Sequence, residues 1–103
     1  MATTPKVLYE GQLPNSKTTL FTSVGTTVVN FASFLNTNTT SETVRIFVKR
    51  GTSREIIHQD LLQWGSVRDF ELGKLTLENG DLIEGQTTTA SKVDAWISGF
   101  VVA

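Results

Sequence analysis

The sequence contains no cysteine and only one histidine, His58. Without cysteine the chain can form no disulfide and carry out no thiolate chemistry. A single histidine cannot supply the several nitrogen ligands of a typical transition-metal site, and no G-x-S-x-G segment presents a nucleophilic serine. We therefore expect that the protein is not an enzyme and has no catalytic, metal-binding or cofactor-binding residues. His58 is expected to be a structural or surface residue.

Long apolar runs and clusters of positive charge are also missing. No apolar run approaches the ~20 residues of a membrane-spanning helix, so no membrane partner is expected. The net charge is −1, and Lys49-Arg50 is the only adjacent pair of basic residues. Nucleic-acid binding requires a basic stripe, so no nucleic acid is expected either. The N-terminal segment MATTPK lacks the apolar core of a signal peptide, which predicts synthesis in the cytoplasm.

The composition indicates one small β-rich domain. The chain has 103 residues, of which 39% are hydrophobic and 18% charged, and this length predicts a single domain over residues 1–103. Threonine, serine, asparagine and glutamine take the place of many charged residues, and threonine suits a pleated sheet because it is β-branched. Since the domain is small and lacks disulfides, we expect that packing and possible self-association stabilise it.

The opening segment, residues 6–23, has the two-residue period of a strand. Val7 and Tyr9 alternate with their neighbours, which favours a strand over a helix. Pro14 and Asn15 supply the residue types of a turn, and an extended segment resumes after them. The chain is therefore predicted to open with two strands joined by a turn.

Two longer extended segments follow, TTVVNFASFLN (26–36) and TVRIFVKR (43–50). A polar loop, TNTTSE, separates them, and we expect them to form a hairpin around it. Register then pairs Leu35 with Val44 and Ser33 with Ile46, which puts the inner faces together.

Further extended segments complete the chain. GTSRE is predicted to be a turn. IIHQDLLQW (56–64) could be a strand with a bulge or a single helical turn, and we favour a strand followed by irregular chain. VRDFELG and LTL are predicted to be extended, and ENGD (78–81) is predicted to form a type I′ hairpin turn. Two more strands follow, in LIEGQTTT and SKVDAWISGFVV.

About eight short strands and no amphipathic helix predict an all-β fold, an antiparallel β-sandwich of jelly-roll type. The alternating pattern also predicts which side chains form the core: Val29, Phe31, Leu35, Val44, Ile46, Val48, Ile83, Val93 and Ile97.

Three carboxylates, Glu78, Asp81 and Glu84, lie close together in the sequence. They could hold a hard cation or act as an acid/base pair. We favour the alternative of a solvated turn whose charges discourage edge-to-edge pairing.

Four aromatic residues fall on faces predicted to be wet. Phe34 and Phe47 are diagonal neighbours on the outer face of the predicted hairpin, and Trp96 and Phe100 lie on the outer face of the last strand. Another segment of the chain could cover them. Alternatively they form a subunit interface, where aromatic residues are enriched. Phe34, Phe47, Trp96 and Phe100 are therefore the candidate interface residues.

Several of these segments together resemble a group of small β-sandwich virion proteins of tailed bacteriophages. The shared pattern comprises an opening LY-x-GQLP (Leu8–Pro14), an Asn-rich hairpin (Asn30–Val48), L-x-L-x-x-GD-x-I-x-G (Leu75–Gly85) and the pair Ser98-Gly99. It covers nearly the whole chain. Its residues belong to turns and core, so they mark no binding site.

The resemblance implies a capsid decoration (cement) protein that stabilises the assembled shell. Its partner would be the major capsid protein, it would reside in the virion, and it would be a homo-oligomer, often a trimer, without a cofactor. The alternative is a tail or tail-fibre component that contacts tail proteins or host-surface sugars. A hydrolase of cell-wall polymers is disfavoured because no acid/base constellation is present.

Overall fold

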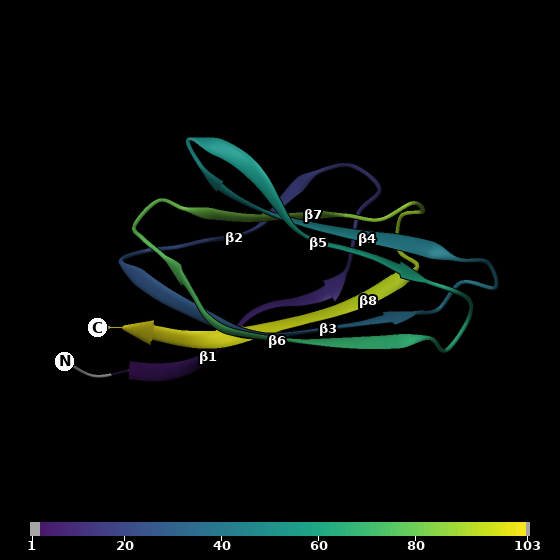
Figure 1. Cartoon of the computed structure of the whole chain (residues 1–103), viewed down its shortest axis with the longest axis horizontal. Coiled ribbons are helices and arrows are strands. Elements are labelled where there is room, and N and C mark those ends of the chain that lie inside the picture. Colours follow the sequence, from purple (N-terminus) through teal and green to yellow (C-terminus); the bar gives the residue numbers. More distant parts are fainter. Residues whose placement is uncertain (1–2, 103) are drawn as a thin grey trace.

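The computed structural model describes residues 3–102, apart from the side chain of residue 74, and arranges them as two layers of antiparallel strands (Figure 1). The expected all-β sandwich is confirmed, and no helix occurs within this range. The eight strands are β1 (Thr3–Gln12), β2 (Thr18–Thr22), β3 (Thr26–Asn36), β4 (Glu42–Arg50), β5 (Thr52–Leu61), β6 (Val67–Leu77), β7 (Leu82–Gln86) and β8 (Val93–Val102).

Each layer is a four-stranded sheet. Sheet A has the order β1-β8-β3-β6 and sheet B the order β2-β7-β4-β5. The chain therefore crosses from one sheet to the other at every connection except the one between β4 and β5. This order favours the jelly-roll interpretation, in which Greek-key connections join two packed sheets.

The predicted hairpin between residues 26–36 and 43–50 is wrong, although both segments are strands. β3 pairs with β6 and β8 in sheet A, whereas β4 pairs with β5 and β7 in sheet B. Leu35 is opposite Val67 and Asp94 rather than Val44, and Ser33 is opposite Asp69 and Trp96 rather than Ile46. The polar loop carries the chain between layers instead of turning it back within one sheet.

A β-bulge at Asn30 reverses the two faces of β3 halfway along the strand. Val29 is opposite Gly99 of β8 and Phe31 is opposite Ser98, so Asn30 has no partner there. Before the bulge the odd position Val29 is buried, and after it the even position Phe34 is buried. Phe31 is therefore only partly buried and Leu35 is 36% exposed, so their predicted place in the core is wrong.

The core lies between the sheets and includes six of the nine predicted residues, with Val48 packed against it. Sequence patterning placed Val29, Val44, Ile46, Ile83, Val93 and Ile97 correctly. The buried cluster also contains Leu8, Leu13, Ala32, Phe34, Ile57, Leu61, Leu77 and Ala95.

The turn at 78–81 is real, but it is not the predicted type I′ hairpin. A type I′ turn requires positive φ at both central residues. Gly80 has φ 90°, whereas Asn79 is not among the described residues with positive φ. β6 and β7 belong to different sheets, so this turn also joins the two layers. The side chain of Asn79 instead accepts the N–H of Gly25 (2.9 Å).

Residues 56–61 are strand, as predicted, but the preceding turn is shorter than expected. β5 begins at Thr52, and Arg50 is paired with Thr52 across Gly51, whose φ is 69°. The predicted five-residue turn GTSRE is thus reduced to a tight reversal at one glycine.

Candidate functional site

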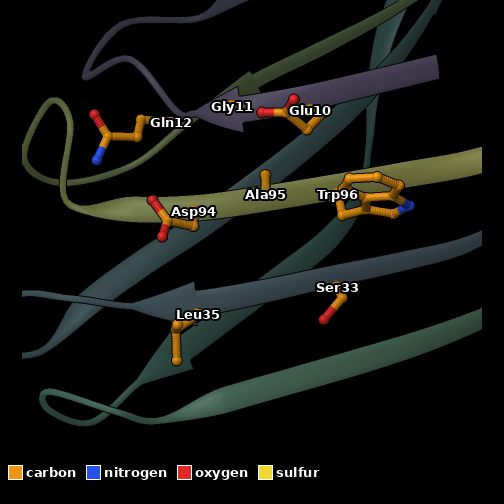
Figure 2. A pocket seen from close by; sticks show the side chains of 8 residues that line it. All are labelled: Glu10, Gly11, Gln12, Ser33, Leu35, Asp94, Ala95 and Trp96. Atoms are coloured by element: carbon orange, nitrogen blue, oxygen red, sulfur yellow. The ribbon is translucent and has the colours of Figure 1, made fainter. Parts of the chain in front are cut away.

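The outer face of sheet A carries an open groove at the end of the sandwich where β1 and β3 end (Figure 2). Its volume is about 480 Å³. We call it the Trp96 groove and define it by its lining residues: Glu10, Gly11, Gln12, Ser33, Leu35, Asp94, Ala95 and Trp96.

Strand register explains why these distant residues meet. Trp96 of β8 lies between its cross-strand partners Glu10 of β1 and Ser33 of β3. Asp94 lies two residues from Trp96 on β8. In the same way it is flanked by Gln12 of β1 and Leu35 of β3. Side chains two apart on a strand share a face, so the two rows form one surface.

The polar groups of the groove are mostly free. Ser33 Oγ donates to Asp69 Oδ1 at 2.6 Å, which fixes its hydroxyl. Within residues 3–102, the side chains of Glu10, Gln12 and Asp94 have no hydrogen-bond or ion-pair partner, and all three residues are exposed. The lining contains two carboxylates and no lysine, arginine or histidine.

Trp96 is the large apolar element of the groove. The residue is 45% exposed, on a strand that is hydrogen-bonded on both sides. Phe100 lies on the same outer face of β8, is partly buried and lines a neighbouring hollow of about 320 Å³. Trp96 and Phe100 are thus where the sequence pattern placed them.

Phe34 and Phe47 are not exposed, which corrects their predicted position on a wet outer face. Phe34 is fully buried between the sheets, 5.9 Å from the ring of Phe70 in an edge-to-face contact. Phe47 is 5% exposed because the Lys17 Nζ lies 4.5 Å and the Arg45 guanidinium 5.1 Å from its ring centre. The alternative that another part of the chain covers an outer-face ring holds for Phe47, whereas Phe34 points into the core.

Sequence reasoning missed an exposed apolar end of the molecule. Leu62 is 74% exposed, Trp64 69% and Val67 59%, in and just after the connection between β5 and β6. We call these three residues the apolar tip. Gly65 donates its N–H to Asn36 O (2.8 Å), which holds the connection against the end of β3. The signal was the apolar LLQW segment, which we assigned only to strand and irregular chain.

His58 lies on the exposed outer face of sheet B, in a short charge network. Its Nδ1 is 3.1 Å from Glu55 Oε2, and the same oxygen accepts Arg45 Nε at 2.7 Å. The hydrogen bond from Arg45, supplemented by the one with His58, lowers the pKa of the Glu55 carboxyl. An exposed ion pair of this kind adds little stability.

The three clustered carboxylates are tied to other groups instead of converging. Asp81 is 5% exposed, and its Oδ2 accepts Arg50 Nε (2.9 Å), Arg50 Nη2 (2.7 Å) and the N–H of Glu78 (2.8 Å). Glu84 accepts Ser53 Oγ at 2.9 Å. The expectation of a solvated turn is therefore wrong for Asp81, because its carboxylate is buried and hydrogen-bonded to both Arg50 and the backbone of the turn. Across the described side chains, no group of three or more His, Cys, Asp or Glu residues could hold a metal ion.

Comparison with known proteins found no matching protein family, no matching curated protein and no matching solved structure. None of the described segments is a helix long and apolar enough to cross a membrane.

Proposed function

We propose that the protein is a structural component of a bacteriophage virion, most specifically a capsid decoration protein that binds the assembled shell. The resemblance of the sequence to small virion proteins is the first support for this proposal. The structural observation that supports it is the apolar tip, because large apolar side chains exposed together at one end suit insertion into a pocket on a partner.

The proposed mechanism is thermodynamic and needs no turnover. A protein that binds only the assembled shell stabilises it by mass action. Repetition of the same weak contact over a symmetric lattice adds avidity. Trp64 would be the main anchor on the major capsid protein, since tryptophan is enriched among the residues that dominate interface energetics.

Copy number on purified virions tests this function. A decoration protein is present in many copies per particle, whereas a tail component is present in few. Particles stripped of the protein should rebind it and regain heat resistance. The Trp64→Ala variant should rebind less than wild type. Val24→Ala is the control, because Val24 is also exposed but lies in the connection before β3, at the opposite end of that strand from the tip. Absence of the protein from virions would refute the proposal.

Self-association into a homotrimer forms part of the same proposal. Phe34 and Phe47 are covered within the chain, so of the four candidate interface residues only Trp96 and Phe100 remain open to a partner copy. Sedimentation equilibrium decides this point. A monomer over the working concentration range would remove the trimer while leaving capsid binding open to the direct test above.

The second candidate is a tail or tail-fibre component that contacts other tail proteins or the host surface. The Trp96 groove favours it, because a small-molecule-sized groove with free polar groups has no evident use in binding a flat shell. A few copies per virion, located at the tail by labelling, would favour this candidate over the first.

A further inference from the structure

We propose that the Trp96 groove is a binding site for an uncharged saccharide. This inference stands on the geometry of the groove and does not rest on the proposed virion function. It holds or fails whether the protein is attached to a capsid, to a tail or to neither. It is an alternative to a homotrimer formed through Trp96, because such a trimer would cover the groove.

The indole of Trp96 supplies an apolar platform. Sugars present patches of C–H groups on the faces of their rings, and an aromatic face carries the negative charge density that attracts them. Trp96 is 45% exposed while its backbone is paired with β1 and β3. The platform is thus accessible and held on a rigid element, which lowers the ordering cost of binding.

The polar groups around the ring match hydroxyl chemistry. Glu10 and Asp94 offer acceptors only, whereas the Gln12 amide offers both donors and an acceptor. None of these three side chains has a partner among the described residues. A sugar hydroxyl donates and accepts at once, so a polyol can satisfy all of these groups. An ammonium or guanidinium ligand could only donate, and would leave the Gln12 donors unused.

The charge of the groove limits which saccharides fit. Its lining carries two carboxylates and no basic side chain. A sialic or uronic acid would bring a third negative charge into this surface without a partner, which is unfavourable. The ligand class is therefore a neutral sugar.

The size of the groove agrees with a short oligosaccharide. A volume of about 480 Å³ lies within the ~300–1,000 Å³ usual for small-molecule sites. Trp96 and its neighbours Glu10 and Ser33 form one row of the site, and Gln12, Asp94 and Leu35 form the next (Figure 2). The two rows are separated by two residues of extended chain, roughly 7 Å, which suits one or two sugar rings.

The two tryptophans permit an experiment with an internal control. In a two-dimensional ¹H–¹⁵N spectrum of the whole chain, Trp96 and Trp64 each give an indole N–H signal. The probes are cellotriose, chitotriose, mannotriose and lactose as neutral saccharides, a hyaluronan tetrasaccharide as the acidic one, and hexalysine as a cationic peptide. We expect at least one neutral saccharide to shift the Trp96 indole and the Gln12 side-chain amide while the Trp64 indole stays in place.

Variants extend the test to affinity. Trp96→Ala should weaken binding of that saccharide at least tenfold. Gln12→Ala should weaken it about fivefold, as the loss of one hydrogen bond predicts. Trp64→Ala should leave the affinity unchanged. Thermal melting checks that each variant folds. Trp96→Tyr is the second variant, because it keeps an aromatic platform and should retain part of the affinity.

Several results would overturn the inference. One is the absence of any shift with all four neutral probes, and another is an equal shift of the two indoles. A third is binding of hexalysine alone, which would make the groove a site for a basic peptide. A fourth is a concentration-dependent shift of the Trp96 indole without ligand, which would mean that a second copy of the chain covers the groove.

Discussion

Gly99 of β8 lies directly against the backbone of Val28 in β3. A Cβ atom at Gly99 would be 2.0 Å from the carbonyl oxygen of Val28, well inside van der Waals contact. The two strands approach this closely where the bulge at Asn30 shifts the register between β3 and β8. The glycine of the Ser98-Gly99 pair thus has a structural reason in this fold.

Gly99→Ala should therefore be destabilising, because backbone atoms cannot move aside as a flexible side chain can. We expect a loss of about 1–3 kcal/mol or more in the free energy of unfolding, measured by chemical denaturation. Ser98→Ala is the control and should change stability by no more than about 0.5 kcal/mol. Equal stability of Gly99→Ala and wild type would contradict the close approach.

The reversed faces of β3 predict different costs for two phenylalanines. Phe34 is fully buried and Phe31 only partly, so Phe34→Ala should cost about 3–5 kcal/mol and Phe31→Ala clearly less. The denaturation midpoints of the two variants give the comparison directly. A larger loss for Phe31→Ala would mean that the bulge at Asn30 is misplaced.

The Asp81–Arg50 pair predicts a dependence of stability on acid pH. The hydrogen bond from Arg50, together with that from the Glu78 N–H, lowers the pKa of the Asp81 carboxyl. Because the folded pKa is below the unfolded value of about 3.9, its stabilisation is complete above that value and is lost as pH falls through the folded pKa.

Asp81→Asn should accordingly be less stable than wild type at neutral pH, and the difference should shrink as the pH falls below ~4. Thermal melts from pH 7 to pH 2 test this. Glu55 also has a lowered pKa, so Glu55→Gln measured in parallel separates the contribution of the exposed pair. A difference in stability between wild type and Asp81→Asn that does not change with pH would contradict the lowered pKa of Asp81.

The buried carboxylate of Glu42 is hydrogen-bonded to two connections, the one between β3 and β4 and the one between β7 and β8. The residue is 1% exposed, its Oε1 accepts the N–H of Thr89 (2.8 Å) and its Oε2 accepts Asn38 Nδ2 (2.9 Å). Glu42→Ala leaves these donors without their acceptor, which should cost about 1–3 kcal/mol. Faster hydrogen exchange at the Thr89 amide would localise the effect.

The exposed Glu71 provides the control for this variant. Glu71→Ala should change stability by less than about 0.5 kcal/mol and leave exchange at Thr89 unaffected. Unchanged stability and exchange in Glu42→Ala would show that neither connection depends on this carboxylate.

Strand positions could be predicted from the sequence, whereas strand partners could not. β3 occupies residues 26–36 as predicted, because its two-residue period is bounded by turn residues. The same period says nothing about which strand lies alongside, so the nearest segment, residues 43–50, was taken as the partner. Pairing in this fold instead follows the crossings between the sheets.

Only part of the candidate site could be predicted from the sequence. Trp96 and Phe100 lie on a strand whose alternation holds from Val93 to Phe100, and they point outward as expected. Phe34 was misplaced because Asn30 gives no local signal of a bulge, such as a glycine. Phe47 was wrongly predicted to be exposed, because Lys17, thirty residues away in the chain, covers its ring. Glu10 and Gln12 could not be placed beside Trp96 before β1 was known to pair with β8.

The strand order also has a consequence for how fast the chain folds. Among the eight described strands, only β4 and β5 are both consecutive in sequence and hydrogen-bonded to each other. Sheet A joins Thr3 to Val102, so its edge cannot form until both ends of this stretch of chain are available. Folds dominated by such non-local pairing usually fold in milliseconds to seconds. We therefore expect the β4–β5 hairpin to form first and β1 to dock late, so that during synthesis on the ribosome sheet A is completed only after β8 has emerged.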